Sequence, residues 1–118
     1  MAEIAELMRA NLLDVFGERD PERRRAAIAR TYHPDVVFSV GDDKSIGHEA
    51  LDAAVKDILD GAPDFAFSPD GDILVNDDLG YLAWKLGPEG APPVVRGLDI
   101  ALVRDGLIVR LYTFLLTE

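Results

Sequence analysis

The segment 94–116 constrains the fold of this chain more than any other stretch of the sequence. It contains two long apolar runs, residues 94–103 and 107–116, joined by Arg104-Asp105-Gly106. An Asp-Gly pair between two apolar runs is a strong signal for a β-hairpin, because glycine adopts the positive φ that a tight turn needs. Both runs are rich in Val, Ile, Leu, Tyr and Phe, which suit a pleated and largely buried surface. The sequence therefore predicts a long hairpin at the centre of the fold.

Asp99 lies near the middle of the first run, between Leu98 and Ile100. Its carboxylate is either on the solvent side of the sheet, alone or paired with Arg96 or Arg110, or in a cavity of the core. In an apolar cavity without a cation, burial would raise the pKa of the carboxyl and keep it protonated at neutral pH. A protonated aspartate could polarise a carbonyl group, whereas an ionised one could abstract a proton beside it.

The length of the hairpin loop decides which side chains share a face with Asp99. A three-residue loop over residues 104–106 pairs Asp99 with Leu111, and we favour this register. A two-residue loop over residues 105–106 would instead set Asp99 opposite Tyr112. Because a shift of one residue reverses the direction of every side chain, the two registers predict different sites.

Three helices are expected, and most of the strands follow them. The helices cover residues 3–16, 20–32 (with Arg23, Arg24 and Arg25 on the solvated side) and 47–61. Strands are expected at residues 36–40, 65–68, 73–76 and 81–86, besides the two arms of the hairpin. This order predicts an α+β fold, in which a curved antiparallel sheet of about six strands carries three helices on its concave face and forms a cone.

Length and composition exclude several classes of protein. The 118 residues are expected to form a single domain over positions 1–118, and the absence of Cys excludes disulfides, thiol chemistry and zinc-thiolate sites. A net charge of −10 argues against nucleic acid and anionic membranes as partners, since both need a basic surface. The first residues lack the positive charge of a signal peptide, and no apolar run reaches membrane-spanning length. A cytoplasmic protein is therefore expected.

Three local patterns, in this order, resemble one known superfamily. They are residues 32–38 (Tyr-His-Pro-Asp-Val-Val-Phe), residues 47–51 (Gly-His-Glu-Ala-Leu), and Gly97-Leu98-Asp99 followed by residues 104–108 (Arg-Asp-Gly-Leu-Ile). With the order of elements, they make nearly the whole chain resemble the nuclear transport factor 2-like superfamily, which includes SnoaL-like polyketide cyclases and ketosteroid isomerases. The resemblance is more specific for the fold than for an activity, because this fold hosts many functions.

The resemblance implies that a small apolar molecule is held in the cone between sheet and helices. It also implies a homodimer through the outer face of the sheet, whose bulky apolar side chains would otherwise be exposed to water. That face is expected to contain Leu98, Ile100, Leu102, Ile108, Tyr112 and Phe114.

The resemblance carries over to the catalytic residues only in part. Asp99 matches an acid that ketosteroid isomerases use as a hydrogen-bond donor, and it falls where SnoaL-like cyclases carry an acid/base aspartate. However, Val40 stands where the isomerases have their general base, and their helix-1 tyrosine would fall near Asn11 or Leu12. The leading hypothesis is a small cofactor-free isomerase-like or cyclase-like enzyme that transfers protons on an apolar, ring-containing carbonyl compound through Asp99. The alternatives are a non-catalytic binding module for a small hydrophobic ligand and a structural dimer whose cone is filled by side chains.

The expected pocket combines one acid with mostly apolar residues. Besides Asp99, it is predicted to contain Trp84, Tyr32, Phe38, Val40, Asn11 and Leu111. Trp84 is either a flat wall for a ring-shaped ligand or plain core, and Asn11 either donates into the cavity or bonds to the nearby backbone. No metal is expected, because His33 and His48 lack the spacing of metal ligands. No cofactor is required for proton transfer of this kind.

Overall fold

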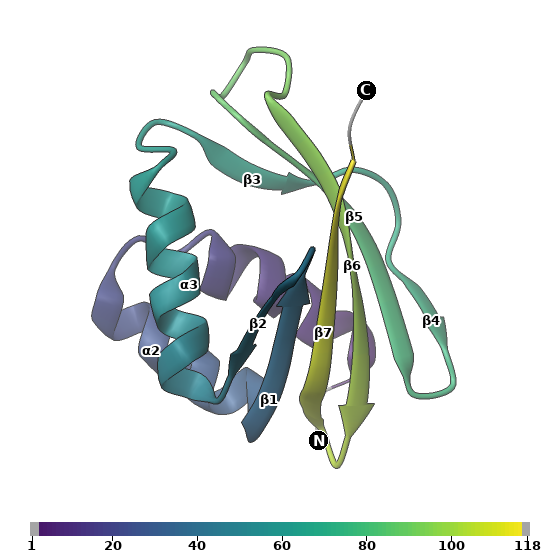
Figure 1. Ribbon diagram of the computed structural model, residues 1–118. Helices are drawn as coiled ribbons and strands as arrows, with labels where there is room; N and C mark the ends of the chain where they lie inside the picture. Colours follow the sequence, from purple (N-terminus) through teal and green to yellow (C-terminus); the bar gives the residue numbers. More distant parts are fainter. Residues whose placement is uncertain (1–2, 117–118) are drawn as a thin grey trace.

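The computed structural model describes residues 3–116 and shows helices packed against one curved sheet (Figure 1). Helix α1 (Ile4–Ala10) continues directly into a π-helical segment, η1 (Asn11–Phe16), and is followed by α2 (Pro21–Thr31) and α3 (His48–Asp60). The strands are β1 (Tyr32–Val40), β2 (Asp43–Ile46), β3 (Ala66–Pro69), β4 (Leu74–Asn76), β5 (Leu79–Gly87), β6 (Val95–Arg104) and β7 (Leu107–Leu116). The expected α+β class is confirmed.

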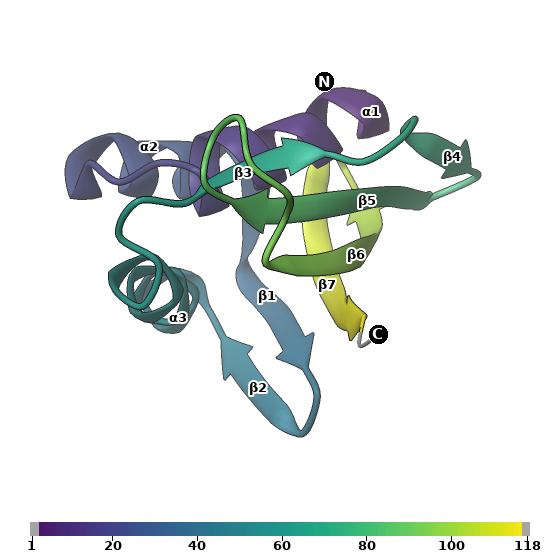
Figure 2. The same ribbon diagram turned by 90° about the horizontal axis from the view of Figure 1, so that it is seen from above.

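The sheet has the order β2-β1-β7-β6-β5-β3 in the described part of the chain, and β4 pairs with the other half of the same edge of β5. All neighbours are antiparallel except β1 and β7, which are parallel. In Figure 2 the sheet bends strongly between β1 and β5, and the helices lie on one side of it. Among residues 3–116, no helix is long and apolar enough to cross a membrane.

The second helix follows the expected start signal but buries a residue that the sequence placed in solvent. Asp20 caps α2 by accepting a hydrogen bond from the Arg23 backbone N–H at 2.9 Å, and Pro21 occupies the first turn. Arg24 is only 2% exposed, and its Nε lies 2.6 Å from Asp52 Oδ1 on α3. The expectation that Arg24 is solvated is therefore wrong, because its guanidinium fixes α2 against α3.

Strands β1 and β2 differ most from the expectation. Strand β1 begins at Tyr32 and passes through Pro34, with an irregularity in its pairing to β7 between Tyr32 and Val37. Strand β2 was not predicted, because its sequence Asp-Lys-Ser-Ile has no apolar alternation. It is an edge strand whose side chains are mostly exposed, so the hydrophobic pattern carries little information there.

The hairpin between β6 and β7 has a two-residue loop and a β-bulge. Asp105 and Gly106 both have positive φ, and Arg104 pairs with Leu107, so the three-residue loop is wrong. The pairing then shifts by one residue, which leaves Val109 as the extra residue of the bulge. Beyond the bulge, Asp99 pairs with Thr113 rather than with Leu111 or Tyr112.

The bulge also changes which residues lie on the outer face of the sheet. Ile108, expected on that face, is fully buried, because it lies on the loop side of the bulge and points into the core. Leu98, Ile100, Leu102 and Tyr112 are half-buried, and Phe114 is exposed. Dimerisation through these residues stays a prediction.

Strands β5 and β6 approach each other closely at Gly97. Trp84 pairs with Gly97 across the two strands, and the Trp84 ring lies directly over the glycine. A Cβ added at Gly97 would lie 2.7 Å from the Phe114 carbonyl oxygen and even closer to the Trp84 ring. Gly97 is therefore required for the position of Trp84.

We expect Gly97→Ala to displace the Trp84 ring and to lower the free energy of unfolding by about 1–3 kcal/mol, as overpacking does. Trp84 is the only tryptophan, so its fluorescence reports the displacement directly. Gly61→Ala is the matched control, because a Cβ there meets nothing closer than 3.5 Å. Identical emission spectra and unfolding curves for the two variants would show that Gly97 does not place the ring.

Candidate functional site

Asp99 lies on the core side of β6 and is 4% exposed. Its Oδ1 accepts hydrogen bonds from Trp84 Nε1 on β5 at 3.0 Å and from Thr113 Oγ1 on β7 at 2.7 Å. Its Oδ2 accepts one from Asn11 Nδ2 at 2.8 Å. Side chains from two neighbouring strands and from the first helical segment thus converge on one carboxylate.

Asn11 is held in turn by Tyr32. Asn11 is the first residue of η1 and is 1% exposed, and its Oδ1 accepts a hydrogen bond from the Tyr32 hydroxyl at close range. Tyr32 is fully buried where α2 passes into β1. Short π-helical segments inside helices are frequent at functional sites, and here the segment starts at the residue that reaches Asp99.

The electrostatics of Asp99 reflect two opposed effects. Burial raises the pKa of the Asp99 carboxyl, and the hydrogen bonds from Thr113, Trp84 and Asn11 lower it by less, so the net shift is upward. Burial also raises the pKa of Tyr32 well above its ordinary value, and the negative charge of Asp99 raises it further. Tyr32 therefore keeps its proton and remains a hydrogen-bond donor at physiological pH.

Asp99 forms part of the wall of a cavity of about 280 Å³ between the sheet and the helices. Apolar side chains make most of this wall, among them Leu12, Phe16, Phe38, Val40, Phe67 and Leu86. Phe67 and Trp84 form a T-shaped ring pair with 5.3 Å between their centroids. Asp99 and Thr113 are the polar residues of the lining, so the cavity suits an apolar molecule with one polar group near Asp99.

The structure brings some of the site residues predicted from the sequence to the cavity wall and leaves others behind it. Trp84, Phe38 and Val40 line the cavity together with Asp99. Tyr32 and Asn11 do not line it but stand behind Asp99 in the hydrogen-bond chain.

Leu111 is fully buried and is not part of the cavity wall, so its assignment to the pocket is wrong. Its place opposite Asp99 is taken by Thr113, because the loop is one residue shorter than expected and the bulge at Val109 shifts the pairing by one more residue. The sequence analysis missed Thr113 for the same reason. Alternation of apolar residues cannot reveal this contact, because the register decides which residue of β7 lies opposite Asp99.

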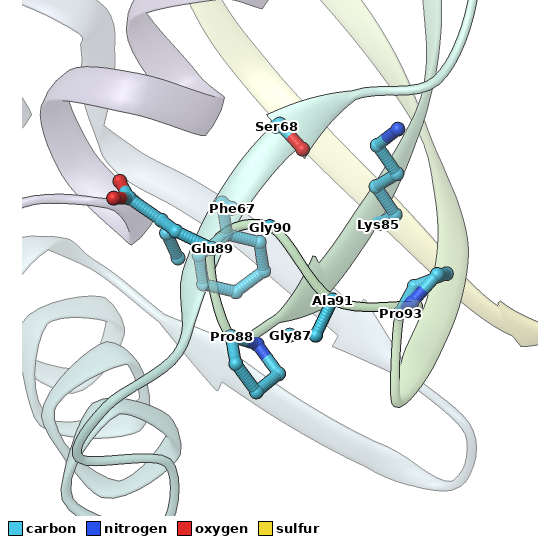
Figure 3. A pocket seen from close by; sticks show the side chains of 10 residues that line it. Phe67, Ser68, Lys85, Gly87, Pro88, Glu89, Gly90, Ala91 and Pro93 are labelled. Carbon is cyan, nitrogen blue, oxygen red and sulfur yellow. The ribbon is translucent and has the colours of Figure 1, made fainter.

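Another pocket, of about 420 Å³, lies between β3 and the loop from β5 to β6 (Figure 3). Ser68 and Lys85, which pair across β3 and β5, line it together with backbone of the Gly- and Pro-rich loop. Its wall is more polar, and it has no buried acid. Within residues 3–116, no group of three or more His, Cys, Asp or Glu side chains could hold a metal ion. The Asp99 cavity is therefore the stronger candidate site.

The raised pKa of Asp99 predicts how stability depends on pH. The folded state favours the protonated carboxyl, so the contribution of Asp99 is fully present below its unfolded pKa of about 4 and is lost as pH rises through the folded value. We expect the free energy of unfolding of the wild type, minus that of Asp99→Asn, to fall as pH increases above about 4. Urea unfolding across a pH series measures this difference. The contributions of the other carboxylates to the free energy of unfolding cancel, because both proteins contain them. A difference that grows with pH would show that the donors outweigh burial.

Comparisons with known proteins identify the family and the fold. The sequence model of the SnoaL-like domain family matches residues 10–111. A search of curated proteins found no match.

Solved structures of similar fold cover nearly the whole chain. A candidate isomerase of the SnoaL-like family from Agrobacterium tumefaciens has a TM-score of 0.87 and 18% identity, over 95% of this chain and 96% of that one. A candidate polyketide cyclase from Sinorhizobium meliloti has a TM-score of 0.72 and 18% identity, over 92% and 93% of the two chains. A candidate ketosteroid isomerase from Kribbella flavida has a TM-score of 0.73 and 17% identity, over 97% and 78%. At these identities the structures show a shared nuclear transport factor 2-like fold, and the family match covers most of the sequence. This chain belongs to the SnoaL-like domain family.

Proposed function

We propose that this protein is a small cofactor-free enzyme that transfers protons on an apolar, ring-containing carbonyl compound, with Asp99 as the acid/base. The observation that carries the proposal is the Asp99 carboxylate, oriented by three neutral donors at the wall of an apolar cavity. The names of the structural relatives, which include isomerases and a polyketide cyclase, agree with proton-transfer chemistry.

The hydrogen bonds favour Oδ2 over Oδ1 as the reacting atom. A carboxylate offers about four acceptor positions, two on each oxygen. Trp84 and Thr113 use both positions of Oδ1, and Asn11 uses one of Oδ2. One position on Oδ2 remains for a proton of the substrate.

The donors favour the ionised base over the protonated hydrogen-bond donor. The described partners of Asp99 all donate to it, and such bonds stabilise the carboxylate. Burial raises its pKa and so makes the carboxylate a stronger base than a solvated aspartate.

In the reaction, Oδ2 removes a proton from the carbon beside the carbonyl group. The C–H electron pair forms a C=C bond, and the carbonyl oxygen becomes the oxygen of an enolate. In a substrate with a C=C bond next to the reacting carbon, return of the proton to the far end of that bond moves the double bond and completes an isomerisation. Alternatively, attack of the enolate carbon on a second carbonyl closes a ring, and the alkoxide so formed takes the proton back from Asp99.

The cavity limits the class of substrate. Among the described lining residues, the N–H of Trp84 and the hydroxyl of Thr113 are both already donated to Asp99, so neither is free for the enolate oxygen. The substrate itself must therefore spread the charge, as β-dicarbonyl compounds do over their second carbonyl group. A volume of about 280 Å³ lies at the lower end of ligand sites and suits one or two rings rather than four.

The test is deuterium exchange at the acidic carbon of a two-ring β-keto ester, methyl tetralone-carboxylate, followed by NMR in deuterated buffer. We expect the wild type to accelerate exchange and Asp99→Asn to lose about a hundredfold or more of this acceleration, because general bases contribute about that much. Asp57→Asn, the same change on the exposed side of α3, is the matched control and retains the wild-type rate.

Equal exchange by Asp99→Asn and the wild type would overturn the proposed role. Saturable binding without any exchange would favour the second candidate function, a non-catalytic binding module for a small hydrophobic ligand. The observation that favours this candidate is Val40, an apolar residue of the cavity wall where the isomerases have their base.

A further inference from the structure

We propose that Tyr32 is a positioning residue, whose hydroxyl locks the side-chain amide of Asn11 so that its NH₂ rather than its carbonyl faces Asp99. Neither residue lines the cavity, so neither touches the substrate. The consequence for catalysis rests on the function proposed above, whereas the consequence for the Asp99 carboxyl does not.

The argument starts from the two orientations that an asparagine amide can take. In the observed one, Oδ1 accepts from the Tyr32 hydroxyl and Nδ2 donates to Asp99 Oδ2. A rotation by half a turn would bring the Asn11 carbonyl oxygen against a carboxylate oxygen. This contact between two acceptors is tolerated only if Asp99 is protonated.

Tyr32 decides between these orientations. In the rotated amide, the Tyr32 hydroxyl would face NH₂ and would lose the acceptor for its own proton. Tyr32 and Asn11 are 0% and 1% exposed, so water cannot replace that acceptor. The raised pKa of Tyr32 keeps its proton in place, which makes the hydroxyl a permanent donor.

The lock therefore acts on the proton affinity of Asp99. The groups that face Asp99 from η1, β5 and β7 are the neutral Asn11, Trp84 and Thr113, and Tyr32 is the titratable group behind Asn11. Without the Tyr32 hydroxyl, the amide is free to rotate, and its carbonyl oxygen can then accept a hydrogen bond from protonated Asp99. Removal of this hydroxyl should therefore raise the pKa of Asp99. It should also weaken the hydrogen bond between the Asn11 amide and the Asp99 carboxylate.

The arrangement differs from ordinary core packing. A phenylalanine and a leucine would fill the same space without two buried polar groups, which are costly unless they are fully paired. Among the described residues, no buried side-chain polar atom lacks a hydrogen-bond partner. Tyr32 donates to Asn11 and Asn11 donates to Asp99, so both hydrogen bonds run toward the carboxylate. This direction stabilises the ionised form of Asp99.

The experiment compares Tyr32→Phe, Asn11→Leu and the double variant, and measures the pKa of Asp99 by carbon NMR of labelled protein without ligand. We expect each single variant to raise this pKa. Because Tyr32 acts through Asn11, the double variant should show no further shift beyond that of Asn11→Leu. Tyr112→Phe on the outer side of β7 is the matched control and should leave the pKa unchanged.

The pH profile of deuterium exchange supplies the catalytic readout. In Tyr32→Phe we expect the acidic limb of this profile, where exchange rises with pH as Asp99 ionises, to move to higher pH. Exchange should also be slower by about tenfold or more at the wild-type optimum, because the acceptor oxygen is less well oriented. Circular dichroism checks that each variant is folded, and Asn11→Leu provides the pKa test if Tyr32→Phe does not fold.

The outcomes separate the two proposals. A raised pKa in a protein that never exchanges deuterium would support the lock and overturn the proposed enzyme. An unchanged Asp99 pKa in both Tyr32→Phe and Asn11→Leu would overturn the lock, whatever the exchange activity of the wild type. Additive shifts in the double variant would also overturn it, because they would show that Tyr32 acts independently of Asn11.

Discussion

The burial of the Asp99 carboxylate is the interaction on which the rest of this structure depends. An ionised group loses much of its hydration in an apolar interior, and that loss is tolerated only where hydrogen bonds replace the water. Here the replacements come from η1, β5 and β7, which means that the first helix and the central strands must meet at one point. The curvature of the sheet brings these elements together, and Gly97 leaves room for the Trp84 ring that donates one of the bonds.

The same arrangement separates the polar part of the site from its apolar part. The hydrogen-bond chain of Tyr32, Asn11 and Asp99 lies in the packed interior, while the cavity in front of Asp99 is lined by aliphatic and aromatic groups. A ligand in the cavity therefore meets a single oriented carboxylate. This geometry suits proton transfer on a molecule that can delocalise its own charge, and it gives little support to chemistry that needs two separate polar groups.

Much of the fold could be predicted from the sequence, because long apolar runs and clear turn residues mark most of its elements. The hairpin, the helix start at Asp20-Pro21 and the α+β class follow from such patterns. Alternation left open which side of the sheet Asp99 faces, and the structure places it in the core together with Ala101, two residues along β6. The edge strand β2 escaped detection, because its exposed residues carry no hydrophobic pattern.

The details of the site could not be predicted in the same way. The pairing of β7 is irregular with both β1 and β6, and the two-residue loop together with the bulge at Val109 decides that Thr113 rather than Leu111 meets Asp99. The partner of Asn11 is likewise a matter of tertiary structure, since Tyr32 is 21 residues away along the chain. Such contacts between distant segments leave no local signal, although the residue types at both ends are informative once the fold is known.

The measurement that tests this account most directly is the binding of a matched pair of ligands, tetrahydronaphthol and its methyl ether, followed by the fluorescence of Trp84. The phenol can donate a hydrogen bond to Asp99 Oδ2, whereas the ether cannot. The account predicts saturable quenching by both ligands, with about tenfold or more tighter binding of the phenol, and a loss of this preference in Asp99→Asn. Equal affinity of the wild type for the two ligands, or no saturable quenching by either, would contradict the claim that an oriented carboxylate faces a ligand cavity.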